Sequence, residues 1–225
     1  CMFADILVAV SGEETDWPSV AQAVEIACRE SARLLGLHVV DSASDRESEK
    51  VRALQAEFAR HCELLGVDGK LAIEVGQVAR KICERARWAD LVVVSLSHPP
   101  TRQPVLRLGS GFRTLVRRCA TPVLAVPGAF SPLSQPLLAF DGSPKAREAL
   151  YVAAYIAGRG AVPLTVLSVS EGDRSAAAAL DEAAAYLEPH SVKAQFIERS
   201  GPVAEQILDT ARARGSDLVL MGSYS

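Results

Sequence analysis

The residues with the clearest potential for ligand chemistry follow an apolar run near the middle of the chain. Asp141, Gly142, Ser143 and Pro144 come directly after the run 136–140. A carboxylate at the end of a buried strand can accept hydrogen bonds from the amine or hydroxyl groups of a ligand. Ser143 also suits the N-cap of a helix and Pro144 its first turn. The tetrapeptide alone therefore leaves two interpretations open, a ligand site and an ordinary strand-to-helix turn.

Two further segments contain glycine where a ligand could approach the backbone. Gly222 and Ser223 follow the apolar run 218–221, and a glycine there permits close approach. Gly109, Ser110 and Gly111 precede a helical pattern, where backbone N–H groups can cradle an anion. The alternatives are a turn glycine in the first case and a glycine-rich N-cap in the second.

Basic residues gather around the second of these segments. Residues 91–140 contain no Asp or Glu, although the whole chain has a net charge of −3. We interpret Arg102, Arg107 and Arg113 as a field that attracts phosphate. Arg117 and Arg118 fit the end of a helix, where cations favour the dipole.

The remaining reactive residue types show no spacing that indicates catalysis or metal binding. Hydrolase and phosphate-loop motifs are absent, the four His are scattered and the five Cys form no CxxC pair. We interpret Glu13, Glu14 and Asp16 as acids that favour a helix start. The sequence thus predicts no catalytic residue and no metal site.

The elements that must position these residues alternate between strands and helices. Apolar runs predict strands over 5–10, 37–40, 71–75, 90–94, 122–126, 136–140, 164–169, 194–197 and 217–221. The first helix is expected to end at Gly36, and residues 41–50 are expected to form a loop. Strict alternation predicts βαβ units, hence parallel sheets with helices on both faces. Such sheets bind ligands at the carboxyl ends of their strands, at a switch point in the strand order.

The pattern then repeats. Residues 76–95 align with 201–223, and 5–12 with 136–142, which gives a period of roughly 125–130 residues. We therefore expect two copies of one domain, residues 1–130 and 131–225, with a linker at 128–135. The second copy is expected to be incomplete, because the chain stops where the first copy continues with a loop, a helix and a fifth strand.

Composition narrows the function classes. Hydrophobic residues make up 49% and charged residues 23%, as in globular domains. An acidic net charge and 5% aromatic residues argue against nucleic-acid binding. Neither a run long enough to cross a bilayer nor a signal peptide is evident. We expect a cytoplasmic protein without membrane contact of its own.

Together the motifs resemble the universal stress protein family. The matching segments are LLAFDGSPKAREAL (137–150), SDLVLMGSYS (216–225), ADLVVVSLS (89–97) and LGSGFRTLVRRCATPVLAVP (108–127). The resemblance implies an α/β fold of two Rossmann-like domains, each with a parallel sheet flanked by helices. It also implies a pseudo-twofold relation between the domains, with the strand at 122–126 near their interface.

Many members of the family bind ATP, and the resemblance assigns such a site to the second copy. The nucleotide-binding residues that it implies are Ala139, Asp141, Gly142, Ser143, Val169, Met221, Gly222 and Ser223. Ser225 departs from the family's second loop glycine. In the first copy Ser11 replaces the Asp, and Ser95 and His98 replace two glycines. There the resemblance leaves a phosphate or anion site at Gly109, Ser110 and Gly111.

The resemblance implies a stress-response or regulatory protein that binds ATP or a related adenine nucleotide. The question whether Mg²⁺ accompanies the nucleotide stays open, as does weak ATP hydrolysis. The expected partners of the protein are the nucleotide and either a second copy in a homodimer or the other domain of the same chain. Two alternatives are a dimerisation module that binds no nucleotide and a cytoplasmic regulatory domain of a membrane transporter.

Overall fold

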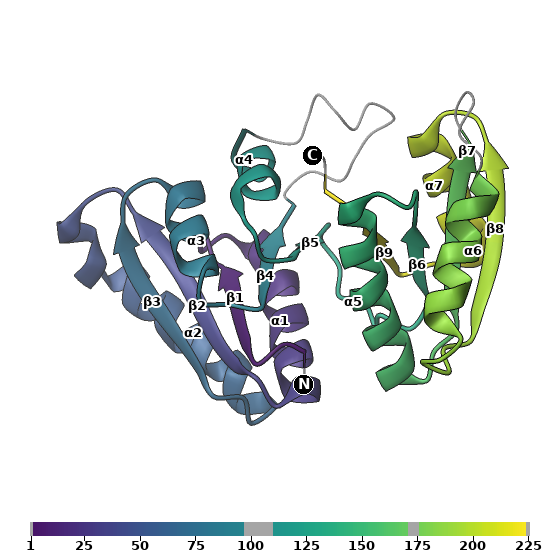
Figure 1. Ribbon diagram of the computed structural model, residues 1–225. Coiled ribbons are helices and arrows are strands. Elements are labelled where there is room, and N and C mark those ends of the chain that lie inside the picture. Colours follow the sequence, from purple (N-terminus) through teal and green to yellow (C-terminus); the bar gives the residue numbers. More distant parts are fainter. Residues whose placement is uncertain (1, 97–109, 171–175, 224–225) are drawn as a thin grey trace. The chain divides into compact units, whose positions relative to one another are not determined.

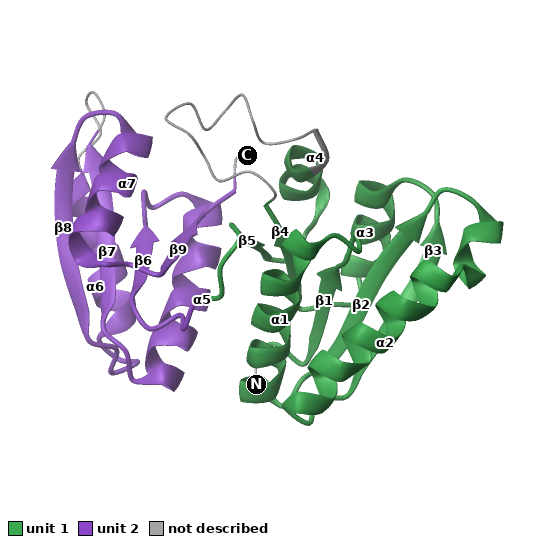
Figure 2. Ribbon diagram, turned by 180° about the vertical axis from the view of Figure 1, so that it is seen from behind, with its two compact units in different colours: residues 1–130 green, residues 131–225 purple. Residues whose placement is uncertain are grey.

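The computed structural model describes residues 2–96, 110–170 and 176–223. The chain divides into two compact units, unit 1 with residues 1–130 and unit 2 with residues 131–225 (Figure 2). Each unit contains one parallel sheet with helices on both faces (Figure 1). The predicted fold class, α/β with parallel sheets flanked by helices, is confirmed.

Unit 1 has a five-stranded sheet in the order β3-β2-β1-β4-β5. Its strands are β1 (Asp5–Ala9), β2 (Arg33–Val40), β3 (Gly69–Val75), β4 (Leu91–Ser95) and β5 (Val123–Val126). Helices α1 (Trp17–Glu30) and α2 (Glu49–Leu64) pack on one face, each preceded by a 3-10 helix, η1 (Glu14–Asp16) or η2 (Ala43–Glu47). Helices α3 (Val78–Ala86) and α4 (Ser110–Arg118) pack on the other face.

The described part of unit 2 has a four-stranded sheet in the order β8-β7-β6-β9. Its strands are β6 (Pro136–Ala139), β7 (Leu164–Ser170), β8 (Ala194–Ser200) and β9 (Leu218–Met221). Helices α5 (Pro144–Gly160) and α6 (Ala176–Leu187) cover one face, and α7 (Val203–Arg214) packs on the other. Both sheets therefore have the alternating construction that the apolar runs predict.

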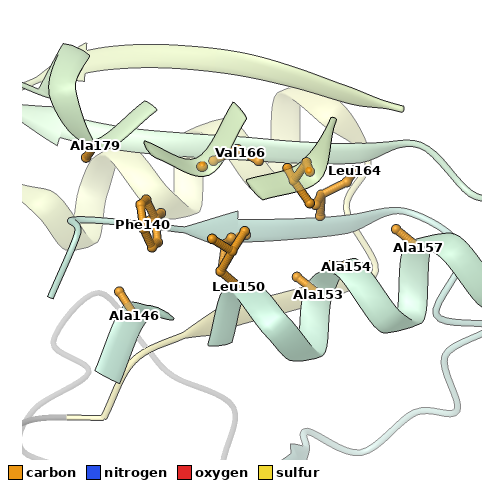
Figure 3. Close-up of a cluster of buried hydrophobic side chains, with 12 residues drawn as sticks. Phe140, Ala146, Leu150, Ala153, Ala154, Ala157, Leu164, Val166 and Ala179 are labelled. Atoms are coloured by element: carbon orange, nitrogen blue, oxygen red, sulfur yellow. The ribbon is translucent and has the colours of Figure 1, made fainter. Parts of the chain in front are cut away.

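The central strands bury both of their faces. Leu138 of β6 packs toward α5 and α6 in a cluster that includes Phe140 and Leu150 (Figure 3). Its neighbour Leu137 points to the opposite face, where it packs with Ile207 of α7. Because successive side chains of a strand alternate between faces, a strand covered on both sides is apolar throughout. This explains why β6 appears in the sequence as a continuous apolar run.

The expectation that Gly36 ends the first helix is wrong. Helix α1 ends at Glu30, and Ser31 after it adopts the left-handed conformation with φ 52°. Gly36 lies inside β2, where a Cβ atom would lie 2.7 Å from the side chain of Leu71 and 2.8 Å from that of Phe58. The glycine is therefore required by the close packing of β2 against β3 and α2.

The expectation that residues 41–50 form a loop is also corrected. This segment contains η2 and the first residues of α2. The hydroxyl of Ser48 caps α2 by accepting a hydrogen bond from the Val51 N–H at 3.3 Å. Serine at an N-cap satisfies a backbone donor that the helix leaves unpaired, so a polar segment can begin a helix.

The internal repeat extends to individual hydrogen bonds at the helix ends. Ala32 N–H donates to the Ala27 carbonyl at 2.9 Å, and Val162 N–H donates to the Ala157 carbonyl at 3.1 Å. In each case the residue before the donor, Ser31 or Ala161, has a left-handed backbone. Helix α1 therefore ends in the same way as α5, and the two helices can be compared position by position from this point.

An aspartate holds the amino end of the first strand in each unit. The Asp90 carboxylate accepts hydrogen bonds from the N–H groups of Ala4 and Asp5, at 2.8 and 3.0 Å. The Asp217 carboxylate accepts from the N–H groups of Ser134 and Gln135, at 2.8 and 2.7 Å. Both aspartates lie at the edge opposite the carboxyl ends of the strands, so their role is structural.

Candidate functional site

The switch point of each sheet lies between the first and fourth strands of its unit. In unit 1 the chain builds β2 and β3 on one side of β1, then continues with β4 and β5 on the other side. In unit 2, β6 and β9 are neighbours in the same way, and Ala139 pairs with Met221 at their carboxyl ends. The structure therefore brings Asp141, which follows β6, and Gly222, which follows β9, to one edge of the sheet.

The turn after β6 has the geometry that its sequence predicts. Asp141 is exposed, and its Oδ1 accepts a hydrogen bond from the Ser143 N–H at 2.9 Å. The Ser143 hydroxyl caps α5 by accepting from the Ala146 N–H at 3.2 Å, and Pro144 lies in the first turn. Gly142 has φ 73°, a left-handed backbone conformation that is unfavourable for a residue with a side chain. The expected N-cap at Ser143 is confirmed.

Three of the candidate residues form an apolar strip beside this turn. Ala139 and Val169 pack on the face of the sheet that α7 covers. Met221 shares that face, because it pairs with Ala139 across parallel strands, and it is 54% exposed. In unit 1 the counterpart of Met221 is Val94, which is 5% exposed and packs in the cluster with Leu115 of α4.

Gly222 and Ser95 occupy equivalent positions, two residues beyond the paired positions Leu220 and Val93. A Cβ atom on Gly222 would lie 2.6 Å from the backbone nitrogen of Ala146. The neighbour that requires this glycine is therefore the first turn of α5, and no ligand is needed to explain it. In unit 1 the Ser95 hydroxyl instead donates a hydrogen bond to the Thr15 carbonyl at 3.1 Å.

The turn after β1 in unit 1 is filled by the chain's own carboxylate. Asp16 Oδ2 accepts hydrogen bonds from the Ser11 N–H and hydroxyl, both at 2.5 Å, and from the Gly12 N–H at 3.1 Å. Asp16 is 6% exposed. Asp16 lies at the predicted helix start, in the first turn of η1 and directly before α1, but its side chain does not cap α1, and its carboxylate turns back to the strand end. When α1 and α5 are aligned from their equivalent carboxyl ends, the counterpart of Asp16 is Ala146 of α5.

Sequence reasoning placed Asp16 at a helix start but missed this role, because it compared residues only at matching positions of the two copies. Ser11 matches Asp141, so the first copy lacks a carboxylate at that position. The signal that could have found Asp16 is the turn itself: the N–H groups of Ser11 and Gly12 need an acceptor when they are partly buried. A nearby acidic side chain is the simplest acceptor for these two N–H groups.

Charged side chains on α5 and α6 flank the unit 2 turn. Arg147 of α5 forms an ion pair with Glu182 of α6 at 2.5 Å, and this guanidinium lowers the pKa of the Glu182 carboxyl. A Cβ atom on Gly142 would lie 3.6 Å from Glu182 Oε2, so the pair borders the turn directly. Lys145 is paired with Glu148 at 2.9 Å.

Several predicted residues lie outside the described ranges. These are Gly109, His98, Arg102, Arg107 and Ser225. Ser110 and Gly111 form the first two residues of α4, and Ser223 is exposed after Gly222.

In the described ranges, no three His, Cys, Asp or Glu side chains come together in a way that could hold a metal ion. No helix within those ranges is both long and apolar enough to span a bilayer.

Parallel sheets with candidate residues at their switch points define a doubly wound α/β protein. The model of the universal stress protein family matches residues 2–127 and 136–225. The chain therefore belongs to this family and contains two copies of its domain, as the motifs indicated. No match was found among the curated proteins.

Solved structures support the fold across both units. A universal stress protein from Archaeoglobus fulgidus DSM 4304 is 17% identical to this chain. The match covers 97% of this chain and 86% of the other chain, with a TM-score of 0.83. A putative universal stress protein from Pseudomonas aeruginosa UCBPP-PA14 is 19% identical, with coverage of 97% and 82% and a TM-score of 0.74. A universal stress protein in complex with cAMP is 22% identical, with coverage of 57% and 100% and a TM-score of 0.50.

Proposed function

We propose that unit 2 binds an adenine nucleotide, ATP or a relative, at the carboxyl edge of β6, β7 and β9. The observation that carries the proposal is the exposed Asp141 carboxylate at the switch point, next to the apolar strip of Ala139, Val169 and Met221. The carboxylate can accept hydrogen bonds from ribose hydroxyls or the adenine amine, and the strip offers apolar surface to the base. Gly142, Ser143, Gly222 and Ser223 border the same edge and are the residues proposed to approach the phosphates.

Family membership supports this proposal. The neighbouring structure with cAMP is a universal stress protein that holds an adenine nucleotide. This motivates cAMP as a second test ligand beside ATP, since it keeps the adenosine part and carries a single phosphate.

For unit 1 the geometry favours the alternative of a domain without nucleotide. Asp16 already satisfies the Ser11 and Gly12 N–H groups, and Ser95 is bonded to Thr15. A nucleoside that entered this edge would have to displace these internal hydrogen bonds. We propose that unit 1 pairs with another domain, either unit 2 or a second copy, and that it binds at most an anion at residues 109–111.

The proposed role is regulatory and not catalytic. The proposed role of the Asp141 carboxylate is to accept hydrogen bonds, from Ser143 at one oxygen and from the ligand, and the other proposed site residues supply no group with the character of a general base. The proposal includes a cytoplasmic location, and it allows Mg²⁺ to accompany ATP.

Titration calorimetry with ATP, cAMP and GTP tests the proposal. We expect ATP or cAMP to bind and GTP to bind more weakly. Asp141→Ala should weaken adenine-nucleotide binding about ten- to a hundredfold, the loss of a hydrogen bond to a charged group. The matched control is Ser11→Ala at the equivalent position of unit 1, which should leave affinity unchanged. Equal losses at both positions, or no binding by the unaltered protein, would contradict the assignment.

A further inference from the structure

Two cysteines that are distant in sequence lie side by side in unit 1. The Sγ atoms of Cys83 and Cys119 are 3.2 Å apart, although the residues are 36 positions apart in the chain. Cys83 belongs to α3, and Cys119 follows the last residue of α4. Both residues are partly exposed, and both side chains also pack against the apolar cluster that includes Ile82 and Leu115.

Hydrogen bonds hold the segment on both sides of Cys119. The Cys119 N–H donates to the Leu115 carbonyl at 2.8 Å, which continues the hydrogen bonding of α4. Two residues later, the Thr121 hydroxyl contacts the carbonyls of Ala86 and Ala89, at 2.8 and 3.2 Å, at the end of α3. The segment that carries Cys119 is therefore tied to the helix that carries Cys83, and the short sulfur–sulfur distance follows from the packing of α3 against α4.

The other described cysteines have no such neighbour within hydrogen-bonding distance. Cys28 is exposed on α1. Cys62 is buried beside Gly69, where burial raises the pKa of its thiol to about 11. These two residues therefore provide internal controls, one accessible and one protected.

We propose that Cys83 and Cys119 are a reversible redox pair that forms an intramolecular disulfide when the protein meets a peroxide. A disulfide needs an S–S distance of about 2.05 Å, so the sulfur atoms must approach by about 1 Å. Rotation of the two side chains can supply much of this movement, because the two sulfur atoms already face each other within 3.2 Å. The proposal is independent of nucleotide binding, which we assign to unit 2.

The chemistry balances with hydrogen peroxide as the oxidant. The Cys83 thiolate attacks one peroxide oxygen, the O–O bond breaks, and a sulfenic acid and one water are formed. The Cys119 sulfur then attacks the Cys83 sulfur and displaces the hydroxyl as a second water. Two thiols and one peroxide thus give one disulfide and two waters, and a thiol reductant reverses the oxidation.

The environment assigns different roles to the two sulfurs. Burial and the hydrogen bond with Cys83 raise the pKa of the Cys119 thiol to about 12, so Cys119 is a poor first nucleophile. Cys83 is therefore the peroxide-reactive residue, and Cys119 resolves the sulfenic acid.

The disulfide would join α3 to the junction between α4 and β5. The closed loop contains β4, the neighbour of the central strand β1. Cross-linking a loop of this length restricts the unfolded chain, so we expect the thermal midpoint of unit 1 to rise by about 5–10 °C on oxidation.

Oxidation of the full chain with hydrogen peroxide tests the proposal. We expect peptide mapping to find a Cys83–Cys119 disulfide, an intact mass lower by two hydrogens, and full recovery of the thiols with a reductant. Cys119→Ser should stop at the sulfenic acid of Cys83, which a dimedone probe traps, and Cys83→Ser should lose the fast peroxide reaction. Cys28→Ser is the matched control and should still form the disulfide.

Two outcomes would overturn the proposal. One is a Cys83–Cys119 pair that stays reduced at peroxide levels that oxidise glutathione. The other is a protein whose disulfides are all intermolecular and persist in Cys83→Ser. A midpoint that rises equally in the unaltered protein and in Cys83→Ser would show that any stabilisation has another origin.

Discussion

The Ser95 hydroxyl at the end of β4 donates a hydrogen bond to the Thr15 carbonyl at 3.1 Å, which ties the strand to the turn that precedes α1. The residues that correspond to Ser95 and Thr15 in unit 2 are Gly222 and Lys145. There the first turn of α5 lies against Gly222, with 2.7 Å between the position of a Cβ atom and the Lys145 carbonyl carbon. The residue at the carboxyl end of the fourth strand therefore differs with the form of the helix start that it contacts, which is 3-10 in unit 1 and α-helical in unit 2.

This relationship predicts that Gly222→Ser destabilises unit 2. The new side chain would meet the backbone of α5, which must shift, and overpacking of this kind costs about 1–3 kcal/mol. Hydrogen exchange at the amides of α5 and β9 measures the effect locally. Both Trp residues, Trp17 and Trp88, belong to unit 1, so tryptophan fluorescence should stay unchanged.

The reciprocal substitution is the control. Ser95→Gly removes one hydrogen bond and creates no overlap, so a loss of about 1 kcal/mol is expected in unit 1. Slower exchange, or no change, in α5 of Gly222→Ser would contradict the close packing argued for this position.

Asp16→Ala should destabilise unit 1. The substitution leaves the N–H groups of Ser11 and Gly12 without their carboxylate acceptor, and hydrogen bonds to a charged group contribute about 1.5–3 kcal/mol each. Water can replace part of the lost hydrogen bonding, because Ser11 is exposed. We therefore expect the free energy of unfolding to fall by about 1–3 kcal/mol in total. Denaturant unfolding followed by tryptophan fluorescence reports it. Glu14→Ala, an exposed acid in the same turn, should have little effect, and an equal loss in both variants would refute the role of Asp16.

A pH dependence is expected from Glu74 on β3, whose side chain is 14% exposed. Burial alone would raise the pKa of this carboxyl, but hydrogen bonds from Arg85 and Lys81 of α3 together hold it below its ordinary value of 4.5. A carboxyl with a lowered folded-state pKa stabilises the fold fully above the unfolded value. That contribution is lost as the pH falls through the folded-state pKa.

The test compares the unaltered protein with Glu74→Gln. The unaltered protein should be the more stable at pH 7, and the difference should shrink as the pH is lowered below about 4.5. Glu63→Gln on the exposed side of α2 is the control and should show no such trend. A difference between the unaltered protein and Glu74→Gln that is constant from pH 7 to pH 3 would show that the α3 cations do not act through this carboxylate.

Much of the fold could be predicted because its signals are local. Apolar runs such as Leu91 to Val94 indicated strands buried on both faces, and Ser143 with Pro144 indicated the start of α5. The repeat between residues 76–95 and 201–223 indicated two domains of one family, and the family model matches both. Each of these inferences depends on residues that are neighbours in the chain or recur with a fixed spacing.

The tertiary structure alone decided the features that depend on distant residues. Gly36 looked like a helix end, but the side chains of Phe58 and Leu71, on two other elements, define its role. The proximity of Cys83 and Cys119 has no trace in their spacing, because it arises when α3 and α4 pack on one face of the sheet. The sequence thus determined which elements form and what family they belong to. The packing of helices on the sheet determined which side chains meet, since contacts between distant residues exist only once the chain has folded.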